Sequence, residues 1–276
     1  MTETQTGRLH VVSTPIGNLG DITLRAIETL RSVKAILAED TRHSRPLLAR
    51  YEIATPLEAY HEHNEASATP RIIERLRGGE SFALITDAGT PLLSDPGARL
   101  VRAAIDAGIP VSPVPGASAL LSALVGSGIP ADRFTFFGFL PRKGPDRAGA
   151  LTAIASLPHA AVLYEAPTRL ADTLGAIAAR GGDGREAVVA REMTKHYEEF
   201  RRGTVHDLAE YYEERPPKGE VVIVVAGAAP RAPDEDALRQ QARQLREGGA
   251  STRDIVRLLV EEHHAPRNLA YRIAHE

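Results

Sequence analysis

The chain of 276 residues contains no cysteine. It therefore cannot form disulfides, use a thiolate nucleophile, or hold zinc or an iron–sulfur cluster through cysteine ligands. The lack of disulfides fits a reducing compartment, and we expect the protein to act in the cytoplasm. The chain is long for a single core, which predicts two domains with room for a small appendage.

Long apolar runs and an excess of positive charge are also missing. The longest apolar run, residues 221–229, is far shorter than the ~20 residues that span a bilayer, so we expect no membrane contact. The first six residues lack a basic start followed by an apolar core, and we expect no signal peptide. The formal net charge of -3 argues against a uniformly basic surface, so contacts with a polyanion must come from a local patch.

Lysine is scarce, with only Lys34, Lys143, Lys195 and Lys218 among 33 basic residues. Against such a bias, a retained lysine indicates a place where a compact, titratable ammonium is useful. Lys34 lies at the expected end of a helix and is ordinary, whereas the other three lie beside the motifs described below.

Short apolar runs alternate with amphipathic segments along the first part of the chain. Runs at 10–12, 35–38, 82–85 and 110–114 predict buried strands of a largely parallel sheet with helices between them. Residues 21–30 show helical spacing of apolar side chains, which predicts a helix capped by Asp21. A proline-rich turn at 113–115 predicts the end of a first α/β domain, residues 1–115.

A second series of apolar runs lies at 134–139, 161–164, 187–190 and 221–225, and predicts a second α/β domain over 116–229. The first of these runs is aromatic and alternating, which predicts a sheet edge or an antiparallel position. Residues 236–246, 252–263 and 267–275 predict three helices, the second capped by Ser251 or Thr252, in a helical appendage over 235–276. Acidic and basic residues balance eight to eight over 231–276, so charge does not indicate nucleic-acid binding there.

The segment 86–97 is the most informative in the chain. An apolar run is followed by two turns, 87–91 and 94–97, and then by a helical pattern. Gly89 and Gly97 can adopt positive φ and let a ligand approach the backbone, while Pro91 and Pro96 stiffen the turns. Loops at the carboxyl ends of strands are where ligands bind in open α/β sheets. The alternative interpretation is a pair of tight turns that caps the helix.

Polar or Gly/Pro-rich loops follow nearly every predicted strand. They span 13–21, 39–44, 87–91, 115–118, 164–170 and 191–195. If both domains are α/β, most of these loops can converge on one cleft. The first loop has neither the Gly-x-Gly-x-x-Gly pattern nor a phosphate loop with Gly-Lys-Ser, so a standard dinucleotide fold or P-loop enzyme is not supported.

Five motifs, taken together and in order, resemble one known family. They are Pro15-Ile-Gly-Asn-Leu, Glu39-Asp-Thr-Arg, Asp87-Ala-Gly-Thr-Pro with Asp95-Pro-Gly, Tyr164-Glu, and Arg191-Glu-Met-Thr-Lys. From about residue 8 to 226 the chain is similar to the ribosomal RNA small subunit methyltransferase I family. The resemblance implies two α/β domains of the tetrapyrrole-methylase fold, with S-adenosylmethionine in the cleft between them, in a homodimer. It also implies a methyl acceptor, the ribose 2'-hydroxyl of a decoding-centre cytidine in the 16S ribosomal RNA of the 30S subunit.

The resemblance further implies which residues hold the cofactor. These are Pro15, Gly17, Asn18, Asp87, Ala88, Gly89, Thr90, Pro91, Ser118, Ala119, Tyr164, Glu165 and Ala166. The sulfonium of the cofactor is a cation, so a carboxylate such as that of Asp87 near it is electrostatically reasonable. Capping of its own turn is the alternative role for Asp87.

Catalysis is expected from two loop tips. A ribose hydroxyl is weakly acidic, so transfer gains from a base or from a cation that stabilises the developing alkoxide. We expect Asp40 as base or orienter and Lys195 as its electrostatic partner, with Glu39 and Arg191 beside them. The alternatives are salt bridges that steady the cleft, and a rate that comes mainly from alignment of the reactants.

RNA contacts are expected from polar residues around the cleft. These are Arg42, His61, Asn64, Arg142, Lys143 and Arg169, for which solvated surface charge is the alternative. His61 and His63 would share a face only in a strand, and no cysteine or distant histidine completes a ligand set. We therefore predict no metal.

Two other functions stay open. The same fold and cofactor serve methylation of a tetrapyrrole carbon, such as a corrin or sirohaem precursor. A ribosome assembly factor that keeps the cofactor site without turnover is the non-enzymatic alternative.

Overall fold

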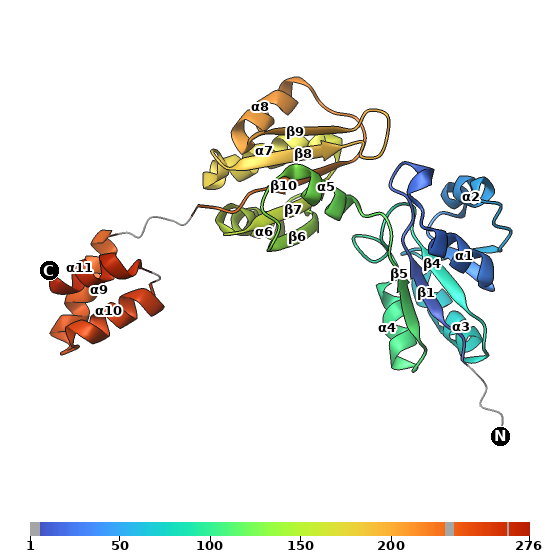
Figure 1. Cartoon of the computed structure of the whole chain (residues 1–276), viewed down its shortest axis with the longest axis horizontal. Helices are drawn as coiled ribbons and strands as arrows, with labels where there is room; N and C mark the ends of the chain where they lie inside the picture. The colour runs from blue at the N-terminus through green and yellow to red at the C-terminus, as the bar shows by residue number, and fades with distance from the viewer. Residues whose placement is uncertain (1–5, 230–234, 264) are drawn as a thin grey trace. The chain divides into compact units, whose positions relative to one another are not determined.

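The structure is a computed structural model that describes residues 6–229, 235–263 and 265–276 (Figure 1). It divides into two compact units, Met1–Ala228 and Ala229–Glu276. The first unit contains two five-stranded sheets, and the second contains three helices. The expected boundary at 115/116 lies between the two sheets, which belong to the same compact unit. Their division into two domains therefore stays a prediction.

The first sheet is wholly parallel, with strand order β3-β2-β4-β1-β5. Its strands are β1 (Leu9–Val12), β2 (Ala35–Ala38), β3 (Leu57–Ala59), β4 (Phe82–Ile85) and β5 (Val111–Val114). The parallel sheet is confirmed, because apolar runs such as 35–38 and 82–85 are buried along their whole length, as a sheet covered on both faces requires. No apolar run predicts β3, which is three residues long and carries Glu58.

Helices cover both faces of the first sheet. They are α1 (Leu24–Ser32), α2 (Thr41–Arg50), α3 (Glu65–Arg77) and α4 (Ala98–Asp106). Leu30 of α1 and Leu47 of α2 pack with Ile36, whereas Ile72 of α3 and Leu100 of α4 pack with Leu37 on the opposite face.

The predicted cap of α1 is wrong. Asp21 ends the short 3-10 helix η1 (Leu19–Asp21), and the side chain of Thr23 caps α1 by accepting a hydrogen bond from Ala26 N. A threonine hydroxyl serves this position as well as an aspartate does, so apolar spacing alone could not select between the two residues.

The second sheet is mixed, with strand order β6-β7-β10-β8-β9. Its strands are β6 (Phe134–Phe139), β7 (Ala160–Glu165), β8 (Glu186–Arg191), β9 (Glu199–Thr204) and β10 (Val221–Val225). The strand β6 lies at an edge, as predicted, and pairs parallel with β7, while the other neighbours pair antiparallel. The half-buried β9 carries three charged residues and gave no apolar run.

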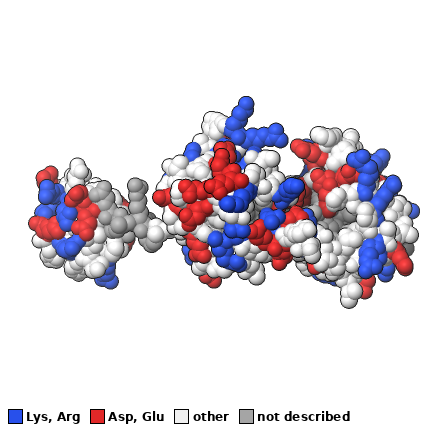
Figure 2. Space-filling view, turned by 90° about the horizontal axis from the view of Figure 1, so that it is seen from above, with Lys and Arg blue, Asp and Glu red and all other residues white. Residues whose placement is uncertain are grey.

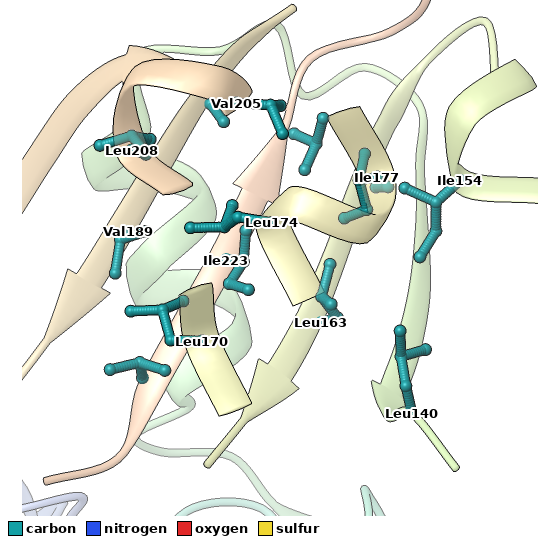
Figure 3. Close-up of a cluster of buried hydrophobic side chains, with 14 of the residues drawn as sticks. Leu140, Ile154, Leu163, Leu170, Leu174, Ile177, Val189, Val205, Leu208 and Ile223 are labelled. Carbon is teal, nitrogen blue, oxygen red and sulfur yellow. The ribbon is translucent and has the colours of Figure 1, made fainter. Parts of the chain in front are cut away.

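The second sheet is also covered on both faces. Its helices are α5 (Ala119–Ser127), α6 (Pro145–Ser156), α7 (Leu170–Ile177) and α8 (Val205–Glu214), with the short helical segments η2 (Pro167–Arg169) and η3 (Ala178–Gly182) beside α7. Figure 3 shows Leu163 and Ile223 of the sheet beside Leu174 of α7. Leu124 of α5 packs on the other face, against Val188.

The second unit consists of α9 (Glu235–Glu247), α10 (Thr252–Glu261) and α11 (Arg267–His275), which confirms the three predicted helices. Ser251 caps α10 by accepting from Asp254 N. Leu238, Leu259 and Ile273 contribute one side chain from each helix to a buried core. In the described parts of both units, no helix is long and apolar enough to cross a membrane.

The topology of the first sheet creates a natural binding position. Strands β1 and β4 are neighbours, yet the chain leaves β1 toward β2 on one side and leaves β4 toward β5 on the other. Where neighbouring connections depart in opposite directions, a crevice opens beyond the carboxyl ends of the strands. The loops 13–18 and 86–97 therefore border that crevice.

Candidate functional site

The loops that follow β1 and β4 are fastened to each other. Thr14 and Gly89 exchange two backbone hydrogen bonds, Thr14 N to Gly89 O at 2.9 Å and Gly89 N to Thr14 O at 3.0 Å. The hydroxyls of Ser13 and Thr90 lie 3.1 Å apart, and Thr90 Oγ1 also donates to Ala117 O at 3.2 Å. These bonds join the loops after β1, β4 and β5 into one rigid edge.

Two adjoining cavities open at this edge. The first has a volume of about 280 Å³ and is lined by residues from both sheets. The predicted cofactor residues in its lining are Asp87, Ala88, Gly89, Thr90, Ser118, Ala119 and Tyr164, together with the expected catalytic residues Glu39 and Lys195. The second cavity has a volume of about 700 Å³, and its lining includes the predicted cofactor residues Pro15 and Gly17.

An irregularity in β6 brings an aromatic ring to the first cavity. The register between β6 and β7 shifts between Phe136 and Phe139, and Gly138 inside this stretch has φ of 60°. Such an irregularity redirects the following side chain. Phe139 consequently lines the first cavity, with its ring 5.5 Å from that of Tyr164.

Glu165 does not face the described lining of either cavity, which corrects its expected role as a cofactor residue. Its buried carboxylate accepts hydrogen bonds from Thr173 Oγ1 at 2.7 Å and from Arg169 Nη2 at 2.9 Å. It also accepts from Ala166 N at 2.8 Å. Side chains alternate across a strand, so Tyr164 reaches the cavity while Glu165 points to the opposite face of the sheet.

Asn18, Pro91 and Ala166 also lie outside the described linings. The Asn18 side chain is engaged in capping η1, where it accepts from Gly20 N at 3.0 Å. Its backbone N–H donates to Thr194 Oγ1 at 3.1 Å, a contact between a loop of the first sheet and a loop of the second. Pro91 directly follows the lining residue Thr90, and Ala166 lies two residues beyond the lining residue Tyr164, so the roles of Asn18, Pro91 and Ala166 at the cofactor stay predictions.

Asp40 caps α2 and does not point into the described lining of either cavity. Its carboxylate accepts from Arg42 Nη2 at 2.9 Å and from Arg42 N at 2.8 Å, and these bonds lower the pKa of Asp40 to about 2. A carboxylate with so low a pKa is a poor proton acceptor at neutral pH. The backbone N–H of Asp40 donates to Asp87 Oδ1 at 3.1 Å, so Asp87 holds a neighbouring loop and not its own turn.

Glu39 has the opposite environment. It lines the first cavity, and burial together with the nearby carboxylate of Asp87 raises its pKa. The surroundings thus give the two adjacent acids different properties: Asp40 is a strongly ionised helix cap, and Glu39 is a more basic carboxylate in the cavity lining.

Lys195 and Arg191 also differ in position, since only Lys195 lines the cavities. Lys195 lines both cavities, with Nζ 3.0 Å from Glu192 Oε1. A Cβ atom built on Gly17 would lie 2.7 Å from Lys195 Cγ and Cε, so glycine at this position lets the lysine cross the loop after β1. Arg191 instead pairs with Glu199 of β9 and lies outside the described linings, so its expected role beside the reacting groups stays a prediction.

The described lining of the first cavity is strongly acidic, with five carboxylates and one ammonium. The carboxylates are Glu39, Asp87, Asp95, Glu192 and Glu220. Burial, with the charge of Glu39 as the next cause, raises the pKa of Asp95 to about 6. The last three were not expected at the site, although Asp95 and Glu192 stand in two of the five motifs; Glu220 directly precedes β10 and belongs to none of them.

Backbone strain is concentrated in two loops of the first cavity. Of the five described non-glycine residues with positive φ, Leu92 (75°) and Ser94 (70°) lie in the loop after β4, and Glu192 (49°) and Thr194 (66°) lie in the loop after β8. Such conformations cost about 1–3 kcal/mol each and persist where surrounding structure enforces them, commonly at functional sites.

The residues expected to contact RNA fall into two groups. Arg42 lines the second cavity with its side chain 86% exposed, and Arg142 and Lys143 are exposed in the segment before α6. Arg169, in contrast, is half-buried and donates to Glu165 and to Leu140 O at 2.8 Å. These bonds engage its guanidinium within the protein, so a contact of Arg169 with RNA stays a prediction.

The segment 61–65 forms a turn and the start of α3. Asn64 Oδ1 accepts from His61 N and Asn64 Nδ2 donates to Ala59 O, each at 2.9 Å, so its amide stabilises this turn instead of facing a substrate. The rings of His61 and His63 lie 5.9 Å apart in a T-shaped arrangement. Within the described residues, no group of three or more side chains could hold a metal ion.

Comparison with known proteins identifies the fold and the family. The family model of the Tetrapyrrole (Corrin/Porphyrin) Methylases matches residues 8–209. A protein of Synechocystis sp. named ribosomal RNA small subunit methyltransferase I is 45% identical over 98% of this chain and 98% of its own length. A protein of Mesorhizobium japonicum with the same name is 52% identical over 83% of this chain and 78% of its own. The crystal structure of uroporphyrin-III C-methyltransferase from Thermus thermophilus, complexed with S-adenosylhomocysteine, has a TM-score of 0.58 at 18% identity and covers 80% of this chain and 97% of its own.

The lining of the first cavity suits the positive charge of the methyl donor. A sulfonium is a cation, and the described lining carries an excess of carboxylates. Gly89, at φ of 80°, presents backbone without a side chain, and a Cβ atom there would lie 3.3 Å from Ile16 Cγ2. With a matching family model over most of its length and relatives that share about half of its residues, the chain belongs to the ribosomal RNA small subunit methyltransferase I family of the tetrapyrrole methylases, and its cofactor is S-adenosylmethionine.

Proposed function

We propose that the protein methylates the ribose 2'-hydroxyl of a decoding-centre cytidine in the 16S ribosomal RNA of the 30S subunit. The name shared by its relatives supports ribosomal RNA as the substrate. The observation that carries the chemistry is the presence of Glu39 and Lys195 in the same cavity lining, a proton acceptor and a cation contributed by loops of different sheets. The protein would act in the cytoplasm and as a homodimer.

Bound S-adenosylmethionine supplies an electrophilic methyl group. Glu39 accepts the proton of the attacking hydroxyl, since its raised pKa makes it a better base than Asp40. The ammonium of Lys195 stabilises the negative charge that develops on the hydroxyl oxygen. Asp40 acts as a positioning residue, because it caps α2 and its N–H bonds to Asp87.

The cofactor and the RNA require surfaces of opposite charge. An acidic lining repels phosphates, so the RNA backbone is held at exposed cations outside the first cavity, with Arg42, Arg142 and Lys143 as candidates. Figure 2 shows basic and acidic side chains interspersed over the face in view. We expect recognition on this face to rest on a few local phosphate contacts.

The deciding experiment incubates the purified protein with labelled S-adenosylmethionine and with 30S subunits from a strain that lacks this enzyme. Nuclease digestion and mapping of the modified nucleotide are expected to place the label on the ribose of one cytidine. Label on a base would exclude the proposed 2'-O chemistry. Retained binding to 30S subunits without transfer would favour an assembly factor.

A further inference from the structure

The second cavity is larger than the first and adjoins it. The two linings share Ile16, Asp87, Ala88, Lys195 and Glu220, so a ligand in either cavity reaches the same boundary. The volume of about 700 Å³ lies within the range of roughly 300–1,000 Å³ that is typical of small-molecule sites. Space therefore remains beside the cofactor for a second ligand of nucleoside size.

The walls of the second cavity are held in place before any ligand arrives. On one side, η1 carries Leu19, whose carbonyl oxygen accepts from Tyr51 Oη at 2.8 Å. On the other side, the first turns of α2 contribute Pro46 and Leu47 to the lining. These apolar side chains offer contact surfaces suited to the faces of a base.

Basic side chains lie at the same cavity. Arg42 and His43, both from the first turn of α2, belong to its described lining. The side chain of Arg42 is 86% exposed and makes a bidentate pair with Asp40, through Nη2 at 2.9 Å and Nε at 3.1 Å. Because this pair lies in solvent, the guanidinium can exchange the carboxylate for a phosphate oxygen, which it binds in the same bidentate way.

We propose that the second cavity binds one nucleoside everted from RNA, with its ribose at the boundary shared with the first cavity. This inference rests on the proposed function, because it assumes that the cofactor occupies the first cavity and that the acceptor is a ribose hydroxyl. Methyl transfer requires the reacting atoms to be in near-attack geometry, which places the hydroxyl at the shared boundary. A nucleotide reaches a recessed site of this kind by leaving the base stack. The base lies between Leu19 and the first turns of α2, and Arg42 contacts the flanking phosphate.

The test uses a substitution that places a larger side chain in the second cavity and leaves the lining of the first unchanged. Leu19 lines only the second cavity and is 37% exposed, whereas Leu24 of α1 is 80% exposed and belongs to neither described lining. We expect Leu19→Trp to lower kcat/KM for unmethylated 30S subunits at least tenfold, while the Kd for S-adenosylhomocysteine changes less than twofold. The matched control, Leu24→Trp, is expected to leave both unchanged. Unaltered kcat/KM in Leu19→Trp, or a matching loss of cofactor binding, would overturn the inference.

A second measurement separates this inference from the proposed substrate. Single-stranded RNA oligonucleotides carrying a central 2-aminopurine are titrated with the protein in the presence of S-adenosylhomocysteine. Eversion is expected to raise the 2-aminopurine emission with the wild type and with Leu24→Trp, but not with Leu19→Trp. If 30S subunits accept no methyl group and this pattern holds, the pocket stands and the proposed substrate is wrong. If the wild type gives no rise in emission, the nucleoside pocket is wrong.

Discussion

We expect the first cavity to distinguish S-adenosylmethionine from its demethylated product by charge, and to do so in a pH-dependent way. Asp95 has a pKa of about 6, raised first by burial and then by Glu39. The other acidic groups that face it are Asp87 and Glu220, with the hydroxyl of Tyr164 nearby. An ionised Asp95 attracts the sulfonium, whereas a protonated one does not.

The size of the effect follows from the titration of Asp95. With a pKa of about 6, roughly nine tenths of the carboxyl is protonated at pH 5 and about one tenth at pH 7. Affinity for S-adenosylmethionine is therefore expected to rise about tenfold from pH 5 to pH 7. The raised pKa of Glu39 acts in the same direction. S-adenosylhomocysteine shares the amino and carboxyl groups but lacks the sulfonium charge, so its affinity is expected to change much less.

Isothermal titration calorimetry with both ligands between pH 5 and 8 measures this difference. Repeating the titrations in buffers of different ionisation enthalpy is expected to show proton release on binding of S-adenosylmethionine near pH 5.5. The variant Asp95→Asn is expected to bind S-adenosylmethionine more weakly at pH 7 and to lose most of the pH dependence. Parallel pH profiles for the two ligands, or a full pH dependence in Asp95→Asn, would refute the reasoning.

Three further predictions concern catalysis, stability and assembly. Glu39→Gln is expected to lower kcat for 30S methylation at least a hundredfold and to leave the Kd for S-adenosylhomocysteine unchanged. Asp40→Asn keeps the α2 cap and is expected to change kcat less than about threefold. A larger loss in Asp40→Asn than in Glu39→Gln in single-turnover assays would contradict these roles. The folded-state pKa of Asp95 lies above its ordinary value of 3.8, so its ionisation destabilises the fold as pH rises from 4 to 6. Asp95→Asn is then expected to raise the free energy of unfolding by about 1 kcal/mol at pH 8, allowing for solvent screening, and to change it little at pH 4. Equal gains in stability at both pH values in urea denaturation would argue against this. In α5 the apolar side chain of Val125 is 82% exposed, and we expect it to be covered in the homodimer. Val125→Glu is therefore expected to shift the mass measured by light scattering from that of a dimer toward that of a monomer. An unchanged mass would disprove this.

Much of the fold follows from residue patterns, because buried parallel strands are apolar along their whole length. The strands β2 and β4 show this pattern and were predicted at their observed bounds. In contrast, β3 and β9 carry charges that are satisfied only in the folded protein. Glu58 of β3 pairs with Arg75 of α3 at 2.8 Å, a partner that local sequence does not reveal.

The direction in which individual side chains of the site point could not be predicted from the sequence. The five motifs lie in loops that contribute to the lining of the first cavity, but neighbouring residues on a strand or at its end point in different directions. The pairs Glu39 and Asp40, and Tyr164 and Glu165, each contain one residue in the first cavity and one outside its described lining. Which member faces the ligand depends on the orientation of the strand, and residue type alone does not determine it.

The contact between the loops of Asn18 and Lys195 has a thermodynamic consequence. Asn18 N bonds to Thr194 Oγ1, and Lys195 crosses Gly17, so a single wall made by both sheets separates the two cavities. A ligand that immobilises this wall from one side reduces the entropy that a ligand on the other side must lose. We therefore expect S-adenosylhomocysteine and RNA to bind cooperatively, each tightening the binding of the other by the same factor.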